Sequence, residues 1–106
     1  MSIGGENVRE RTKRTEMLLG AEAMERLRAA HVVVFGLGGV GSWCAEALAR
    51  SGVGKLTLVD EDAVSESNIN RQLCALGSTI GASKAEAMAA RLRDIAPGAA
   101  IVPVTA

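Results

Sequence analysis

Four glycines, one carboxylate and two cations are the residues of this 106-residue chain that best suit binding chemistry. Gly36, Gly38 and Gly41 have the G-x-G-x-x-G spacing, with Gly39 between them, and they directly follow the apolar run 32–35. Glycines at this spacing allow a tight turn, a backbone that can touch phosphate, and close packing of helix on strand. A helix that begins here directs unbonded N–H groups and a positive dipole end at the turn. The pattern predicts a nucleotide site, and the alternative is a glycine-rich turn without a ligand.

Asp60 follows the next apolar run, nineteen residues after Gly41. A carboxylate at the carboxyl end of the second strand is placed to accept hydrogen bonds from ribose hydroxyls. Capping of a turn is the alternative role for Asp60, and Asp62 fits either role equally well.

The segment 68–72 (NINRQ) helps to choose between ligands. A dinucleotide pyrophosphate carries two charges, which the glycine turn and a helix dipole can hold. A nucleoside triphosphate carries about four charges, more than a half-charge dipole balances, and therefore calls for Arg or Lys. Arg71 lies in the loop beside the turn, and Lys84 lies in the first turn of a helix, where a cation is unfavourable unless an anion is near. Taken together they favour a triphosphate, although for either residue alone an ordinary surface charge would be the favoured interpretation.

Apolar periodicity and glycine or proline breaks define the elements that position these groups. We expect a charged helix over 6–13, a second helix over 21–30, strands near 31–35, 55–60 and 101–105, and helices near 40–51 and 83–96. The last helix begins with a capping box, Ser83 with Glu86. Residues 61–77 have no clear period, which predicts a loop with one short helical turn.

This β-α-β-(loop)-α-β order predicts a Rossmann-like α/β fold with a parallel sheet of strand order 3-2-1. The continuous apolar run 32–35 is typical of a strand buried on both faces, yet this order places it at an edge. We therefore expect a further strand to pair there, and expect the chain to be the N-terminal fragment of a larger domain.

Composition narrows the class of protein. Twelve basic and twelve acidic residues give zero net charge, which indicates no polyanionic partner. Phe35 and Trp43 are the only aromatic residues, which argues against single-stranded nucleic acid binding by stacking. Cys44 and Cys74 form no metal motif and are expected to be reduced thiols in or near the core, and His31 is expected to be structural. Without a signal peptide or a membrane-spanning run, the protein is expected to be soluble and cytoplasmic.

These motifs resemble the ThiF/MoeB/HesA-type (E1-like) adenylating family. The resemblance rests on the glycine motif, Asp60-x-Asp62, Asn70-Arg71-Gln72 and Lys84, and it covers about residues 11–98. The phrases RTEMLLG, GGVGSWCAEALARSGVGKLTLVD and NINRQLCAL look closest to the tRNA threonylcarbamoyladenosine dehydratase branch.

The resemblance implies ATP-dependent activation of a carboxylate through an acyl-adenylate. In that branch the carboxylate belongs to threonylcarbamoyladenosine at position 37 of tRNA, which then cyclises with loss of water. By position, Asp60 would hold the ribose, and Asn68, Arg71, Gln72 and Lys84 would face the phosphates. Arg14 matches an arginine that in relatives reaches the ATP of a partner subunit.

The resemblance also implies a homodimer and Mg²⁺, whose expected Asp ligand would lie beyond this chain. The implied division is an N-terminal helical segment over 1–30 and a nucleotide-binding domain, incomplete at its C-terminus, over 31–106. Activation of a ubiquitin-like sulfur carrier is the alternative within the family. A dinucleotide-binding module of an NAD-dependent dehydrogenase and a structural fragment without a ligand are the alternatives outside it.

Overall fold

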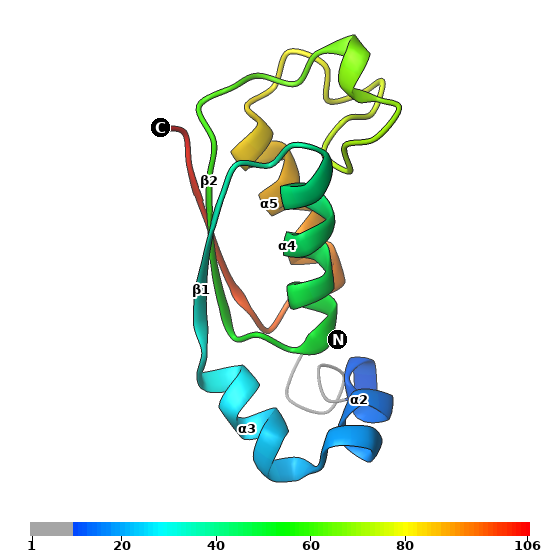
Figure 1. The fold of residues 1–106 in the computed structure, drawn as a ribbon, viewed down its shortest axis with the longest axis vertical. Coiled ribbons are helices and arrows are strands. Elements are labelled where there is room, and N and C mark those ends of the chain that lie inside the picture. The colour runs from blue at the N-terminus through cyan, green and yellow to red at the C-terminus, as the bar shows by residue number, and fades with distance from the viewer. Residues whose placement is uncertain (1–9) are drawn as a thin grey trace.

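The structure, a computed structural model, describes residues 10–106. The elements, in chain order, are α2 (Lys13–Leu19), α3 (Ala21–Ala29), β1 (His31–Phe35), α4 (Gly39–Ser51), β2 (Lys55–Val59), the 3-10 turn η1 (Glu66–Asn68), α5 (Lys84–Ile95) and β3 (Ala100–Val104) (Figure 1). The predicted α/β fold, with helices before a βαβαβ unit, is confirmed. Residues 6–9 of the charged helix predicted over 6–13 lie outside the described residues, and the helix α2 spans Lys13–Leu19. The proposed division at residue 30 stays a prediction.

The three strands are parallel and ordered β1-β2-β3, which is the predicted order. Val32 pairs with Leu56, which in turn pairs with Ile101, so these side chains share one face of the sheet. Successive right-handed crossovers that advance in the same direction place their helices on the same side of a parallel sheet. Accordingly, α4 and α5 lie together on one side of the sheet in Figure 1.

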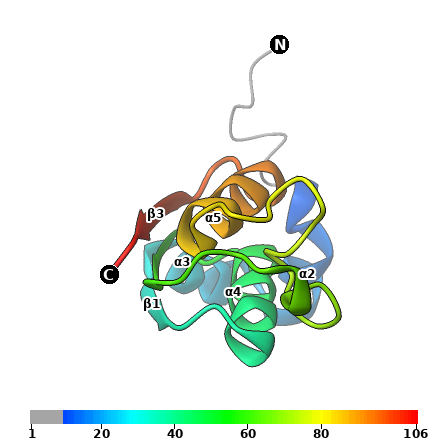
Figure 2. The ribbon, with the colours of Figure 1, turned by 90° about the horizontal axis from the view of Figure 1, so that it is seen from above.

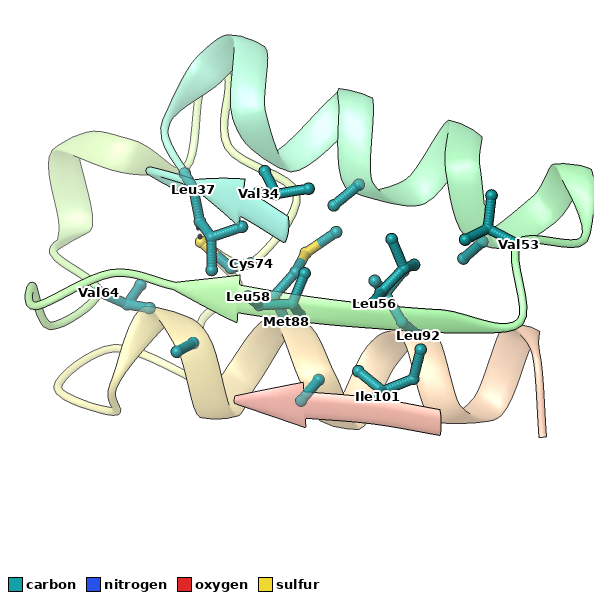
Figure 3. Close-up of a cluster of buried hydrophobic side chains, with 14 of the residues drawn as sticks. Val34, Leu37, Val53, Leu56, Leu58, Val64, Cys74, Met88, Leu92 and Ile101 are labelled. Carbon is teal, nitrogen blue, oxygen red and sulfur yellow. Dashed lines mark hydrogen bonds between the residues drawn. The ribbon is translucent and has the colours of Figure 1, made fainter. Parts of the chain in front are cut away.

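The core fills the space between the sheet and these two helices (Figure 3). Leu56 and Leu58 on β2 are completely buried, and they meet Met88 and Leu92, which α5 presents at helical spacing. The helix α4 contributes small residues, among them Ala45. Small side chains on α4 let that helix approach the sheet closely, which fixes where its first turn lies.

The opposite face of the sheet is uncovered within the described part of the chain. Phe35 is 80% exposed and Val33 is 42% exposed, and Val102 and Val104 on β3 are also exposed. The expectation that 32–35 is buried on both faces is therefore wrong for this chain, because both crossover helices pack on the same side. A continuous apolar run shows only that a strand is suited to burial, whereas coverage depends on what packs against each face.

Several smaller expectations have clear outcomes. The Ser83 hydroxyl accepts a hydrogen bond from the Glu86 N–H at 3.3 Å, as the capping box predicts. Cys74 is buried, whereas Cys44 is exposed and not part of the core; both are free thiols. His31 has a partner that the sequence did not indicate, the Thr57 hydroxyl at 2.8 Å on the neighbouring strand. None of the helices formed by residues 10–106 is long and apolar enough to cross a membrane.

Candidate nucleotide site

The predicted site residues gather at the carboxyl ends of the strands. The glycine turn joins β1 to α4, and the loop 60–83 joins β2 to α5, so both connections lie at the same end of the sheet, uppermost in Figure 1. Figure 2 looks onto this end and shows the green and yellow loop passing over α4 and α5. Ligands of open parallel sheets bind at this end of the strands.

Two of the four glycines are required by the backbone itself. Gly36 has a φ of +88°, a conformation that other residues rarely adopt. A Cβ atom on Gly41 would lie 1.8 Å from the Gly36 carbonyl oxygen, so only glycine allows α4 to pack this closely on the turn. The helix α4 then begins beyond Gly38 with backbone N–H groups that no side chain caps, which is an arrangement suited to an anion.

Asp60 ties the end of β2 to the glycine turn. One carboxylate oxygen accepts a hydrogen bond from the Leu37 N–H at 2.7 Å, and the other accepts one from the Asp62 N–H at 2.8 Å. Both oxygens thus already shape the site, although a carboxylate has about four lone-pair positions and can accept more bonds. The ribose contacts expected of Asp60 and Asp62 stay predictions, and the Asp62 carbonyl accepts a bond from the Lys84 N–H at 3.0 Å.

Arg71 and Gln72 lie against the glycine turn. A Cβ atom on Gly39 would lie 3.6 Å from Cδ of Arg71, and one on Gly38 would lie 3.8 Å from Nε2 of Gln72. The Arg71 guanidinium also donates to the Asn70 side-chain oxygen at 2.8 Å. The cation that was predicted beside the turn is therefore present there and partly pre-positioned.

Asn68 is buried below this segment and organises the loop. Its side-chain oxygen accepts hydrogen bonds from the Ser65 N–H at 2.9 Å and from the Ser65 hydroxyl at 3.0 Å. The Asn68 carbonyl accepts from the N–H groups of Arg71 and Gln72. The side-chain oxygen is used inside the loop, and a direct role of Asn68 toward phosphate stays a prediction.

Lys84 is the second cation of the site. It is the first residue of α5 and only 8% exposed, yet no ion pair or side-chain hydrogen bond to it is found among residues 10–106. The Cys74 thiol lies next to the Leu37 carbonyl oxygen, at 3.8 Å, below the glycine turn (Figure 3). Burial raises the pKa of this thiol and the charge of Lys84 partly opposes that shift, which indicates that the lysine lies near the same turn. A nearly buried cation without an anionic partner is suited to bind an anion.

Arg14 is not brought to this site. It belongs to α2, which lies at the opposite end of the sheet from the glycine turn (Figure 1). Any contact between Arg14 and a nucleotide would therefore have to be made on another copy of the chain.

A cavity of about 570 Å³ lies at that opposite end, between the last turns of α4 and α5, and none of the predicted site residues lines it. Its arginines already have partners. Arg11 donates to the carbonyl oxygens of Asp94 and Ile95, at 2.8 and 3.1 Å, and Arg50 binds Glu46 at 3.1 Å. These contacts close the C-terminal end of α5, whereas the candidate nucleotide site lies at the other end of the sheet.

Comparison with known proteins agrees with this geometry. The model of the ThiF family matches residues 12–106, which is nearly the whole chain. The chain belongs to the ThiF family.

Among individual proteins, this ThiF domain is 52% identical over 89 residues to the tRNA threonylcarbamoyladenosine dehydratase of Bacillus subtilis, covering 84% of this chain and 35% of that protein. It is 45% identical to the molybdopterin-synthase adenylyltransferase of Salmonella typhimurium, covering 80% of this chain and 34% of that protein. The crystal structure of E. coli tRNA N6-threonylcarbamoyladenosine dehydratase in complex with ATP superimposes with a TM-score of 0.92 at 44% identity, covering 100% of this chain and 43% of that one. The chain thus spans about a third of the length of these curated relatives.

Two residues that connect the glycine turn and α4 to the Arg71 loop were not singled out from the sequence as candidate site residues. Ser42 is completely buried, and its hydroxyl donates to the Gly38 carbonyl at 2.6 Å and accepts from the Leu73 N–H at 3.2 Å. The Trp43 indole N–H donates to the Arg71 carbonyl at 3.0 Å. The only sequence signal was their position directly after Gly41, on the helix that the glycine turn begins.

Proposed function

We propose that the protein containing this ThiF domain activates a carboxylate with ATP, forming an acyl-adenylate. The observation that carries the proposal is the pairing of the glycine turn with two cations: Arg71 lies against Gly39, and Lys84 is nearly buried without an ion pair among the described residues. A triphosphate brings about four negative charges to a helix end that supplies about half a positive charge, so these cations have a role with ATP that a dinucleotide would not give them.

The proposed chemistry is positioning and charge neutralisation. A carboxylate oxygen attacks the α-phosphorus, the bond to the bridging oxygen breaks, and pyrophosphate leaves with that oxygen. Backbone N–H groups of the turn, together with Arg71 and Lys84, stabilise the charge on the phosphates, while Asp60 holds the ribose. Gln72 adds a donor beside Gly38 and Asn68 supports the segment. No protein nucleophile is needed.

The acceptor we propose is threonylcarbamoyladenosine at position 37 of tRNA. After adenylation, its carbamoyl group attacks the activated carbonyl carbon and AMP leaves, so the net change in the nucleoside is cyclisation with loss of water. The support is the 52% identity to the Bacillus subtilis dehydratase over 84% of the chain. The alternative acceptor is the C-terminus of a ubiquitin-like sulfur carrier, which the similarity to a molybdopterin-synthase adenylyltransferase supports at lower identity. We propose a cytoplasmic location for this activity, because tRNA, the proposed substrate, is present there.

Mg²⁺ and a second subunit complete the proposal. No group of three or more His, Cys, Asp or Glu side chains that could hold a metal ion occurs within residues 10–106. Mg²⁺ would bind through the phosphates of ATP and through the Asp that the resemblance places beyond this chain. A homodimer is proposed because Arg14 lies at the far end of its own sheet and can reach an ATP only in a partner subunit.

Nucleotide titration tests the proposed function. The complete gene product that contains this chain is titrated with ATP plus Mg²⁺ and with NAD⁺ by calorimetry. Pyrophosphate exchange into ATP is then measured with tRNA carrying threonylcarbamoyladenosine, with unmodified tRNA, and with a sulfur-carrier protein. We expect ATP binding, and exchange that depends on the modified tRNA. Preference for NAD⁺ would contradict adenylation. Exchange that depends on the sulfur-carrier protein would show that the carrier, and not tRNA, is the acceptor.

Matched substitutions connect this activity to the site. Lys84→Met removes the charge and keeps most of the side-chain volume, and Lys55→Met does the same at an exposed lysine on the start of β2. Lys84→Met is expected to weaken ATP binding about 10- to 100-fold, the range for losing a charge-assisted hydrogen bond. Lys55→Met is expected to leave ATP binding unchanged. Equal effects of the two substitutions on ATP binding would contradict the assignment of Lys84 to the site.

A further inference from the structure

The position of Arg71 relative to the glycine turn is set by a small number of contacts. Arg71 lies in an irregular segment after η1. Among the described residues its guanidinium donates only to near neighbours in the chain, the Ser67 carbonyl in η1 at 3.2 Å and the Asn70 side chain. These local bonds fix the shape of the loop. They do not fix the position of the loop relative to α4.

Ser42 makes one of the links between the two. Its hydroxyl donates to the Gly38 carbonyl inside the turn and accepts from the Leu73 N–H, two residues beyond Arg71. Because Ser42 is completely buried, water cannot replace either bond. One hydroxyl therefore joins the backbone of the glycine turn to the backbone of the Arg71 segment.

Trp43 makes a second link from the next position of the helix. Its indole N–H donates to the carbonyl of Arg71 itself at 3.0 Å, although the ring is largely exposed. The two links reach the segment at Arg71 and at Leu73, two residues apart, so it is held to α4 at two points.

We propose that Ser42 and Trp43 are positioning residues that hold the Arg71 segment on the glycine turn, so that the guanidinium meets the phosphates without rearrangement. This rests on the proposed function only for the identity of the ligand. Loss of either link keeps Arg71 and the glycine turn in the protein, but the Arg71 segment can then move relative to the turn. The predicted signature is weaker binding of phosphate-bearing nucleotides with unchanged binding of adenosine.

The chain offers a matched control on the same helix. The Ser51 hydroxyl donates to the Ala47 carbonyl at 2.7 Å, four residues back, as Ser42 does to Gly38, but no bond from Ser51 to the Arg71 segment is found in residues 10–106. Ser42→Ala and Ser51→Ala therefore lose the same kind of helical bond, and only the first loses the link to the loop. Trp43→Phe removes an exposed N–H donor and keeps an aromatic ring, so it is not expected to affect folding.

The closing experiment measures two things on each variant of the complete gene product: amide hydrogen exchange over residues 69–73 without nucleotide, and dissociation constants for ATP and adenosine. For Ser42→Ala and Trp43→Phe we expect faster exchange over 69–73 and about three- to tenfold weaker ATP binding, the range for one hydrogen bond, with adenosine unchanged. In an Arg71→Ala background the same substitutions should cost little further ATP affinity, because they act through Arg71.

The two readouts separate the positioning role from the nucleotide assignment. If the wild-type protein does not bind ATP, the proposed function fails, and exchange over 69–73 still decides whether the links hold the segment. Exchange equal to that of Ser51→Ala in both variants would overturn the proposal. Faster exchange combined with equal losses of ATP and adenosine binding would also overturn it. So would a loss of ATP affinity that is as large in the Arg71→Ala background as in the wild-type background.

Discussion

Gly41→Ala and Gly39→Ala are expected to separate the glycine that the fold needs from one that the ligand needs. A Cβ at position 41 would lie 1.8 Å from the Gly36 carbonyl oxygen and 2.9 Å from its carbon, whereas real Cβ contacts essentially never fall under 3.0 Å. The backbone of the turn would have to move by more than about 1 Å, because neither atom belongs to a flexible side chain. The three atoms nearest to a Cβ at position 39 all belong to the Arg71 side chain, at the ordinary van der Waals distances of 3.6, 3.7 and 3.9 Å.

The expected energies follow from these contacts. Overpacking in a well-packed region costs about 1–3 kcal/mol, and a backbone clash belongs at the upper end, so we expect Gly41→Ala to lower the free energy of unfolding by about 3 kcal/mol. Gly39→Ala lies in the first turn of α4, where replacing glycine gains up to about 1 kcal/mol in helix propensity. Gly39→Ala is therefore expected to leave stability unchanged or slightly raised. If phosphate approaches that backbone, the added methyl weakens ATP binding all the same.

Urea unfolding measures the first effect and ATP titration the second. The midpoint should fall for Gly41→Ala at an unchanged slope, since the same surface is exposed on unfolding. Gly39→Ala should retain the wild-type midpoint and lose ATP affinity. Wild-type stability in Gly41→Ala would refute the close packing of α4 on the turn, and wild-type ATP affinity in Gly39→Ala would refute phosphate contact at that position.

Three further outcomes are expected. Arg71→Ala should weaken ATP binding and leave adenosine binding nearly unchanged, whereas Asp60→Ala should weaken both; calorimetry with the two ligands checks this, and an equal loss in both variants would contradict the assignment. Hydrogen bonding to Arg91 lowers the pKa of Glu46 below its ordinary 4.5, so this pair stabilises the fold above about pH 5, and the stabilisation is lost as pH falls through the lowered pKa. The difference in urea midpoint between wild type and Glu46→Gln should therefore shrink from pH 7 to pH 3. A difference that stays constant with pH would exclude the ion pair as its source. The isolated 106-residue chain should self-associate through the uncovered sheet face, and Phe35→Thr should reduce this in sedimentation experiments; a monomeric wild-type chain would contradict that expectation.

Much of the fold could be predicted from local signals. The apolar run before Gly36 and the break at Gly52 bracket α4 and the strands on either side, and Ser83 marks the start of α5 through its cap. These signals act over a few residues, where residue type directly limits backbone conformation. The parallel order then follows from the handedness of the crossovers rather than from any one residue.

The remaining features depend on contacts that sequence does not encode locally. Asn68 looks like a phosphate ligand by position, yet its side-chain oxygen caps a turn, and both uses suit the same residue type. Ser42 looks like an ordinary helical serine until Leu73 is brought beside it from 31 residues away. Arg14 shows the same limit, since no local pattern tells which end of the sheet its helix will occupy.

The parallel pairing has a consequence for the order in which the molecule assembles. Lys55 pairs with His31 on one side and with Ala100 on the other, so neither half of the sheet can form as a local hairpin. In chains dominated by such distant pairings, long loops must close, at a cost in conformational entropy, before the stabilising contacts form. Such chains therefore fold slowly. The bond from the Leu37 N–H to Asp60 exists only after the first of these loops has closed, and Lys84 joins the site only after the second has begun. The candidate site is therefore complete only late on the folding pathway. If it binds nucleotide as proposed, a nucleotide added during refolding should bind and stabilise only molecules that have completed folding.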